Sequence, residues 1–250
     1  MSAAVYQDYH DYLAQHVVGP FYQKRLEGLK SLRLANILKK KNPYLFKAKN
    51  IEFPQDLVRS IVDAFLSSQE ETMFGNLLEG FAVYVSAQLY GGFKSALPSV
   101  DLEFKRGGKY YIVGIKSSTN WGNADQLRAM KANFKAARER LRVQAIAEEV
   151  VAVNGCMYGK DRNPLKANDD PDKVYYKYAG QDFWQFISGD DQLYREIIKP
   201  IDAEARVKDE VFRKAYTAKV NEMTRDFMAE FMRENEIDWL KLVDYVSLRG

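Results

Sequence analysis

The chain has 250 residues, of which 46% are hydrophobic and 13% aromatic, which is enough for one large domain with a real core. Its single cysteine, Cys156, excludes an intramolecular disulfide and a multi-cysteine zinc site, and its two histidines leave little material for histidine-based metal chemistry. The formal net charge of +3 identifies no partner by itself. The polar start of the chain and the lack of a long apolar segment predict a cytoplasmic protein that makes no use of the membrane.

The first region along the chain is expected to be helical and basic. Leucines at helical spacing predict helices from Tyr6 to about Lys41, and Asn42-Pro43 interrupts the pattern. Nine basic residues against one acid lie between positions 24 and 49. Such a run is most often a solvated helix face, but the interleaved aromatic residues favour contact with a polyanion such as nucleic acid. The residues we expect to contact it are Lys39, Lys40, Lys41 and Lys47.

Two further helices are predicted before the first strand. One covers about 54–66, and Ser68-Gln-Glu-Glu71 has the spacing of a capping box that would open a second helix through about Leu89. Gly91-Gly92 is expected to end that helix. Inside it, Glu79 has small residues one turn away, Gly75 among them, so its carboxylate could approach a neighbouring sheet. The alternative is an exposed glutamate on an amphipathic helix.

A β-hairpin is predicted over 100–116, with its turn at Arg106-Gly107-Gly108. A polar loop, 117–123, leads into a charged helix over 125–142, followed by an apolar strand over 150–157. Short helices are expected over 181–187 and 192–198, and amphipathic helix over the last fifty residues. We therefore predict an α/β fold, with a central mixed sheet flanked by helices. A single domain, 1–250, would contain a basic helical N-terminal region (1–69), a catalytic core (70–200) and a helical C-terminal extension (201–250).

The alternation of side chains along the two strands of the hairpin indicates a possible active site. Side chains two apart on a strand share a face. Asp101 and Glu103 would therefore project together with Lys116, opposite an apolar face, and Gly114 would leave an open spot between them. Two carboxylates and an ammonium suit metal-dependent phosphodiester hydrolysis, because carboxylates bind Mg²⁺ and a lysine can act near the attacking water. A surface salt bridge across a hairpin is the alternative, and from spacing alone the more common one.

The order of these residues resembles the PD-(D/E)XK nuclease superfamily, whose pattern is a helix Glu, then an Asp on a strand, then (D/E)-X-K on the next strand. Here the pattern is Glu79, Val100-Asp101 and Gly114-Ile115-Lys116. The segment IKSSTNWGNADQ, residues 115–126, resembles type II restriction endonucleases of the PmeII-like group, and FWQFISG, residues 183–189, is similar to an element near the end of several such enzymes. The resemblance covers about 74–200. It implies a site-specific endonuclease that cleaves double-stranded DNA with Mg²⁺, or Mn²⁺ in its place.

The chain departs from the superfamily pattern at Gly114, where Asp or Glu is usual. Three explanations remain open. The family can dispense with that carboxylate, with Glu79 or Glu103 supplying the missing ligand, which we favour because Glu103 is expected on the correct face. Alternatively, the glycine is an engineered change that removes cleavage. Or the protein is a natural DNA-binding module that has lost cleavage.

The resemblance implies metal binding by Asp101, Glu79 and Glu103, with Lys116 completing the catalytic set. The loop residues offer hydroxyls and amides for phosphate oxygens or base edges, although capping of the next helix explains some of them equally well. Cutting both strands implies a homodimer, with the C-terminal helix as a candidate contact. No small-molecule organic cofactor is expected. A helical interaction protein with a purely structural hairpin is a further alternative. The loop residues that we expect to contact DNA are Ser117, Asn120, Asn123 and Gln126.

Overall fold

The computed structural model describes residues 1–167 and 169–249. The chain divides into two compact units, and each is described by itself. Unit 1 contains Met1–Val17 and Gly75–Asp202, and unit 2 contains Val18–Phe74 and Ala203–Gly250. Two long helices contribute residues to both units, α5 (Pro54–Tyr90) and α9 (Ile198–Phe231). No helix among the described residues is both long and apolar enough to cross a membrane.

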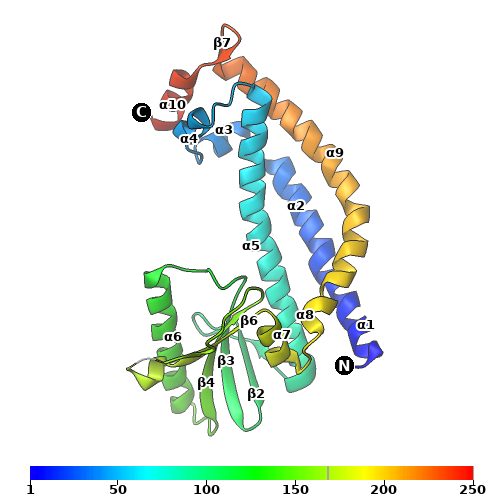
Figure 1. Cartoon of the computed structure of the whole chain (residues 1–250), viewed down its shortest axis with the longest axis vertical. Coiled ribbons are helices and arrows are strands. Elements are labelled where there is room, and N and C mark those ends of the chain that lie inside the picture. Colours follow the sequence, from blue (N-terminus) through cyan, green and yellow to red (C-terminus); the bar gives the residue numbers. More distant parts are fainter. Residues whose placement is uncertain (168, 250) are drawn as a thin grey trace. The chain divides into compact units, whose positions relative to one another are not determined.

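Helices and strands alternate along unit 1, as Figure 1 shows. The N-terminal segment forms α1 (Ala3–Tyr12) and a π-helical turn, η1 (Leu13–Val18), whose last residue belongs to unit 2. The rest of the unit follows α5 in the order β1 (Phe93–Lys94), β2 (Leu102–Arg106), β3 (Lys109–Lys116), α6 (Ala124–Val143), β4 (Glu149–Cys156), β5 (Leu165–Lys166), η2 (Pro171–Lys173), β6 (Tyr175–Ala179), α7 (Gln181–Ser188) and α8 (Leu193–Glu196).

The sheet has six strands in the order β1-β2-β3-β4-β6-β5. β3, β4 and β6 run parallel, whereas β1, β2 and β5 pair antiparallel with their neighbours. The hairpin of β2 and β3 turns at Gly107 and Gly108, which both have positive φ angles of 56° and 73° that favour glycine. The predicted mixed sheet, flanking helices and hairpin are therefore confirmed.

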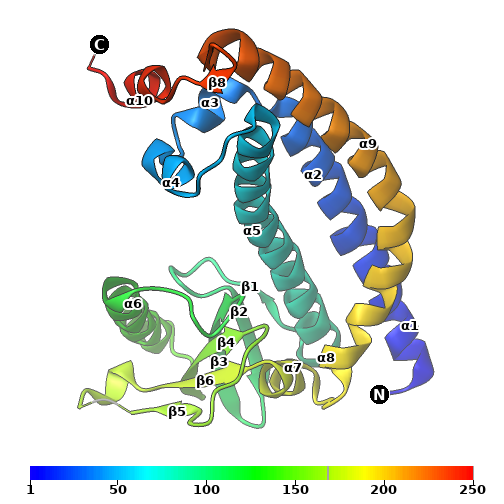
Figure 2. The same cartoon turned by 45° about the horizontal axis from the view of Figure 1, so that its top comes forward.

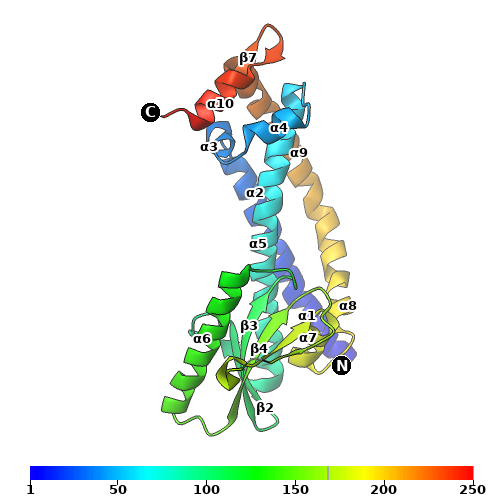
Figure 3. The same cartoon turned by 60° about the vertical axis from the view of Figure 1, so that its left-hand side comes forward.

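Helices cover both faces of the sheet, which corrects the expectation that one face of the hairpin is open. On one face, Met130 and Phe134 of α6 pack against Ile112 of β3 and Ala152 of β4. On the other face, aromatic rings of α5 and α7 pack on the hairpin: Tyr90 stacks on Phe104, and Phe186 contacts the Phe104 and Tyr111 rings. Figures 2 and 3 show α6 alongside the central strands from two directions. A sheet with parallel central strands is normally buried on both sides, which explains the difference.

Two expected boundaries are wrong. α5 is continuous through Ser68, because no proline or glycine interrupts the helix there, and Glu70 inside it pairs with Arg25 at 2.6 Å. The expected helix 192–198 is split between α8 and the start of α9. Asn42-Pro43 interrupts the helical pattern as expected, since α3 ends at Leu38 and the Asn42 side chain caps a new helix, α4 (Pro43–Ala48).

Unit 2 is helical except for a small hairpin. It contains α2 (Gly19–Ser31), α3 (Leu34–Leu38), α4, the first part of α5, most of α9, the strands β7 (Met232–Arg233) and β8 (Glu236–Ile237), and α10 (Trp239–Ser247). One apolar cluster joins these helices, with Leu29 of α2, Ile61 of α5, Phe227 of α9 and Leu242 of α10 all buried. The predicted C-terminal helix is therefore part of this core.

Candidate functional site

Asp101 lies where the β2–β3 ladder ends. Asp101 immediately precedes the first residue of β2, and its carboxylate Oδ2 accepts a hydrogen bond from the Ile115 backbone N–H at 2.7 Å. The side chain of Asp101 is 22% exposed, so the carboxylate is held by the strand and still accessible to solvent. A backbone N–H that donates to a carboxylate also fixes its direction. Asp101 is thus a positioned acid at the carboxyl end of β3.

Lys116, the last residue of β3, lies beside Asp101. Its Nζ is 3.7 Å from Asp101 Oδ2 and donates to the Ile115 carbonyl at 2.9 Å. The ammonium also lies 5.4 Å from the centre of the Trp121 ring, a cation–π distance. The structure therefore brings the predicted aspartate and lysine together at one end of the hairpin.

Glu79 reaches the same place from α5. Its Oε1 is in hydrogen-bond contact with Lys94 Nζ of β1, and its side chain is 18% exposed. One turn earlier, a Cβ on Gly75 would lie 2.6 Å from Ser117 Oγ, so the glycine lets α5 approach the loop after β3 this closely without moving the Ser117 side chain. The small residue beside Glu79 has the effect expected from the sequence.

Lys94 is the residue that sequence reasoning missed. The hydrogen bond with Glu79 raises the pKa of Lys94, and the charges of Glu79 and Asp101 raise it further against the cost of burial. Lys94 therefore lies within electrostatic reach of both acids. We call Glu79, Lys94, Asp101 and Lys116 the charged cluster. A two-residue strand such as β1 has too little pattern to be found in a sequence, which is why Lys94 gave no signal.

Glu103 does not join the charged cluster. It is 5% exposed and accepts a hydrogen bond from Tyr110 Oη at 2.8 Å. Glu103 lies two residues further into the hairpin than Asp101. Burial, and then this hydrogen bond, raise the pKa of Tyr110. Alternation placed Glu103 on the same face as Asp101, but α6 packs over that face, and the Glu103 carboxylate is buried there against Tyr110.

Gly114 leaves no open spot, contrary to expectation. A Cβ there would lie 2.6 Å from the Ser99 carbonyl oxygen and 3.5 Å from the Phe134 ring. The chain before β2 and helix α6 fill the space that an acidic side chain would need. An aspartate or glutamate at position 114 would have to displace backbone, so the glycine is a packing requirement of this structure.

The loop after β3 is docked on the end of β4. The Met157 and Tyr158 N–H groups donate to the Lys116 and Ser117 carbonyls, both at 2.9 Å. Lys177 of β6 donates to the Thr119 carbonyl at 3.1 Å and lies 3.5 Å from Asp161. These contacts fix the backbone that follows Lys116. Lys177 and Asp161 were not found from the sequence, because they come from a strand and a loop far along the chain.

The four predicted loop contacts have different positions. Ser117 is partly buried against Gly75, and Asn120 is exposed. Asn123 and Gln126 form a reciprocal capping box at the start of α6, in which each side-chain oxygen accepts from the other residue's backbone N–H. The capping interpretation of these two residues is therefore correct, and both residues are exposed.

The four predicted lysine contacts belong to unit 2. Lys39, Lys40 and Lys41 lie between α3 and α4, and Lys47 is in the last turn of α4. Among the residues that the structure describes, none of the four forms an ion pair, although Lys39 and Lys47 lie over the Tyr245 and Trp239 rings at 5.7 and 5.3 Å. Uncompensated lysines beside aromatic rings fit a surface for polyanions.

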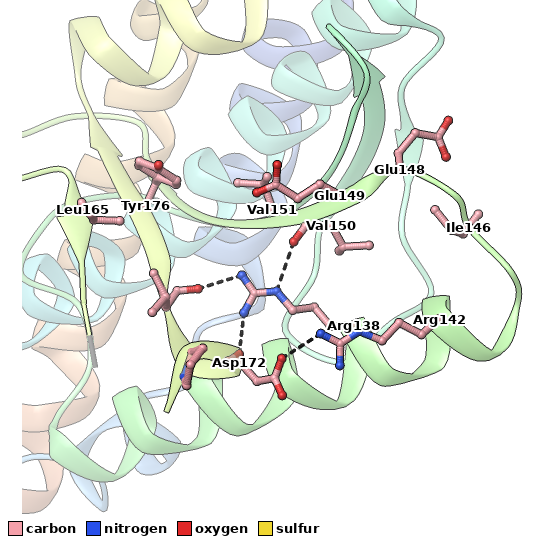
Figure 4. Close-up of a pocket in the computed structure, with 12 residues that line it drawn as sticks. Arg138, Arg142, Ile146, Glu148, Glu149, Val150, Val151, Leu165, Asp172 and Tyr176 are labelled. Atoms are coloured by element: carbon pink, nitrogen blue, oxygen red, sulfur yellow. Dashed lines mark hydrogen bonds and ion pairs between the residues drawn. The ribbon is translucent and has the colours of Figure 1, made fainter. Parts of the chain in front are cut away.

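A pocket of about 420 Å³ lies at the opposite end of β4 and is structural (Figure 4). Arg138 of α6 reaches into its wall and donates to the carbonyls of Val150, Asp172 and Val174, at 3.2, 2.5 and 2.8 Å. Arg142, one turn further along, pairs with the Asp172 carboxylate at 3.0 Å. Because Arg138 is held by three backbone carbonyls and Arg142 is paired with an acid, these contacts tie the wall of the pocket together, which fits a structural role.

In the described parts of the chain, no group of three or more His, Cys, Asp or Glu side chains converges as a ready metal site. The charged cluster instead offers two carboxylates. Mg²⁺ is commonly held by one or two protein carboxylates, with water and substrate phosphate completing its shell. The Lys94 ammonium contacts Glu79 and lies within electrostatic reach of Asp101, so a positive charge already faces these acids.

Comparison with known proteins identifies the family. The family described as type II restriction endonuclease EcoO109I matches residues 8–209, about four fifths of the chain. No curated protein gives a significant match. The matched range includes all four residues of the charged cluster, the loop after β3 and the whole six-stranded sheet. The chain therefore belongs to the type II restriction endonuclease EcoO109I family.

Proposed function

We propose that this chain is a site-specific endonuclease that hydrolyses double-stranded DNA with Mg²⁺, or Mn²⁺ in its place, at the charged cluster. The observation that carries the proposal is the pairing of Asp101 with Lys116 at the end of the hairpin, 3.7 Å apart, with Glu79 reaching the same cluster from α5. The order of these residues supports membership of the PD-(D/E)XK superfamily, and the loop after β3 supports a likeness to its PmeII-like group.

Asp101 and Glu79 would hold the metal ion, whereas the sealed carboxylate of Glu103 would not. A bound divalent cation supplies an activated water and stabilises the charge that develops on the phosphate. Asp101 is suited to this role because the Ile115 N–H holds its carboxylate in one direction. Glu79 is suited because its carboxylate is paired with the exposed side chain of Lys94.

Lys116 would orient the attacking water and add positive charge beside the scissile phosphate. Its ammonium has three N–H donors, of which the Ile115 carbonyl takes one. The remaining donors lie on the side of Asp101 and the Trp121 ring. The hydrogen bond to the backbone holds the ammonium near Asp101 and leaves other N–H donors available for a water or a phosphate oxygen.

DNA contacts would come from both units. In unit 1, Ser117 and Asn120 follow the catalytic strand, and the free NH₂ groups of Asn123 and Gln126 can donate to phosphate oxygens. In unit 2, Lys39, Lys40, Lys41 and Lys47 carry uncompensated charge. We also propose a homodimer, because two active sites are needed to cut both strands together, and its mass in solution can be measured directly.

The test is cleavage of plasmid and phage DNA in Mg²⁺ against EDTA, with the wild type compared to Asp101→Ala and Lys116→Ala. We expect discrete fragments from the wild type in Mg²⁺ and at least a thousandfold slower cleavage by either variant, of the order seen when one catalytic group is removed. Glu103→Gln, on the same strand but outside the cluster, is the matched control. If both alanine variants cut like the wild type, the site is elsewhere.

A DNA-binding module without cleavage is the second candidate, favoured by Gly114 in place of the usual acid. Such a protein would bind DNA with an affinity that falls steeply as salt rises. It would give no product at any Mg²⁺ or Mn²⁺ concentration. Product formation in the digest therefore decides between the two candidates.

A further inference from the structure

Lys94 is a second lysine in the charged cluster, and the usual nuclease pattern does not include it. It pairs with Leu102 across the β1–β2 ladder, next to the point where Asp101 enters the strand. The neighbouring Ser95 N–H donates to the Asp101 carbonyl at 3.2 Å. β1 therefore runs beside the backbone of Asp101, while Glu79 meets the Lys94 ammonium from α5.

The charges of the cluster balance with this lysine in place. Glu79 and Asp101 contribute two negative charges, and Lys94 and Lys116 contribute two positive ones. The arrangement alternates, because Glu79 contacts Lys94, Lys94 feels the charge of Asp101, and Asp101 lies 3.7 Å from Lys116. A divalent cation brought to a neutral cluster gains little from electrostatic attraction, unless one ammonium leaves.

Lys94 is the ammonium that can leave. Its side chain is 64% exposed, against 31% for Lys116. Lys94 is held by the Glu79 carboxylate, whereas Lys116 is also tied to the Ile115 carbonyl and lies over the Trp121 ring. A lysine has a flexible stem and a compact charge, so it can turn into solvent without disturbing a strand.

We propose that Lys94 is the resident counter-cation of Glu79 and Asp101, and that a divalent metal ion binds the cluster by displacing it. Lys94 thereby lowers the affinity of the site for metal and is a positioning residue for the two acids when no metal is bound. This inference rests on the metal site of the proposed function. It adds that Lys94 competes with the metal ion for the two carboxylates and thereby sets the affinity of the site for metal.

The test is a calorimetric titration of Mn²⁺ into wild type, Lys94→Met and Lys105→Met. Lys105 is the matched control, since it lies on the same hairpin, is 56% exposed and pairs with Glu148 at 2.7 Å away from the cluster. We expect Lys94→Met to bind Mn²⁺ about fivefold more tightly than wild type, the equivalent of one ion pair near the surface. Lys105→Met should bind like the wild type.

Glu79→Gln provides a second measurement. Without the Glu79 charge, Lys94 has lost its main partner, so adding Lys94→Met to Glu79→Gln should change the Mn²⁺ affinity much less than it does in the wild type. Such a cycle isolates the interaction between the two side chains from general effects of charge. A thermal unfolding curve for each variant without metal shows whether it is folded.

Weaker or unchanged Mn²⁺ binding by a folded Lys94→Met would overturn the inference. Loss of DNA cleavage together with unchanged Mn²⁺ affinity would instead assign Lys94 to the phosphate. Absence of Mn²⁺ binding by wild type and variant alike at millimolar concentrations would remove the metal site, and the inference with it. If Lys94→Met tightens Mn²⁺ binding while the wild type cuts no DNA, the inference stands and the proposed nuclease activity fails.

Discussion

Cations at the two ends of the β3–β4 ladder are used in different ways. At one end, Arg138 is 9% exposed and gives its donors to three backbone carbonyls. At the other end, Lys116 and Lys94 are partly exposed and face carboxylates. A cation held by carbonyls cannot be exchanged without leaving polar backbone unsatisfied, whereas one held by a carboxylate can be replaced by another cation. The first arrangement stabilises the fold, and the second is suited to binding and chemistry.

The largest effect on stability is expected from Arg138→Met. The substitution keeps the aliphatic stem but leaves the Val150, Asp172 and Val174 carbonyls without their donor, at a cost of about 3 kcal/mol in the free energy of unfolding. Chemical denaturation monitored by circular dichroism measures it. Arg142→Met is the matched control on the same helix, since its exposed ion pair with Asp172 is worth at most about 1 kcal/mol. Equal losses for both variants would contradict the distinction.

Gly114→Glu is expected to have the next largest effect. The new Cβ would lie 2.6 Å from the Ser99 carbonyl oxygen, so the backbone must shift, at about 2 kcal/mol of stability. We expect a lower melting temperature and no gain in cleavage. Faster cleavage by this variant would instead mean that the glycine replaces a lost catalytic acid. Gly107→Asn, in the hairpin turn where a Cβ meets nothing within 4 Å, separates this steric cost from the cost of any added side chain.

The sequence was sufficient for the hairpin and its two central residues because their signals are local. Alternation and the Gly107-Gly108 turn set the register, and the register brings Asp101 to the end of β3 beside Lys116. It was not sufficient for Glu103, whose face is sealed by a helix that arrives later in the chain. Alternation predicts which side chains share a face, but which face stays open depends on tertiary packing.

Lys94 shows the same limit of sequence-based prediction, here for a residue that was missed. It lies close in sequence to Glu79 and Asp101, yet the two-residue strand that carries it has no periodicity. The break expected at Ser68 was also wrong. Its residues fit a capping box, but they lie inside α5, which no proline or glycine interrupts at that point. A capping-box pattern is compatible with the start of a helix and does not by itself end the helix that precedes it.

Lys177→Met should have a smaller and more local effect. It removes the donor to the Thr119 carbonyl and the partner of Asp161, for a loss of about 1 kcal/mol. Because Lys177 acts on the loop after β3, faster hydrogen exchange at residues 117–121 should accompany that loss. Lys177→Arg should restore most of the protection. Lys173→Met, whose exposed ion pair lies with Asp170, should leave exchange in the loop unchanged. Unchanged exchange in Lys177→Met would show that the loop is held by other contacts.

The smallest expected effect is a dependence of stability on pH through Asp161. Burial of this carboxyl acts to raise its pKa. The hydrogen bonds from Lys166 and the Asn163 N–H, with the charges of Lys166 and Lys177, outweigh that effect, so the pKa lies below its ordinary value of 3.8. Its stabilising contribution is therefore fully present above about pH 4 and is lost as the pH falls through the lowered value.

Melting temperatures of wild type and Asp161→Asn, measured from neutral pH downward, test this dependence. Near neutral pH the wild type should melt higher, because the ionised carboxylate pairs with Lys166 at 2.8 Å and with Lys177 at 3.5 Å. Below the lowered pKa both proteins carry a neutral side chain at position 161, so their melting temperatures should converge. A constant difference at every pH would mean that Asp161 contributes through packing and its neutral hydrogen bonds, and that the loop after β3 owes its position to Lys177 without the help of this charge.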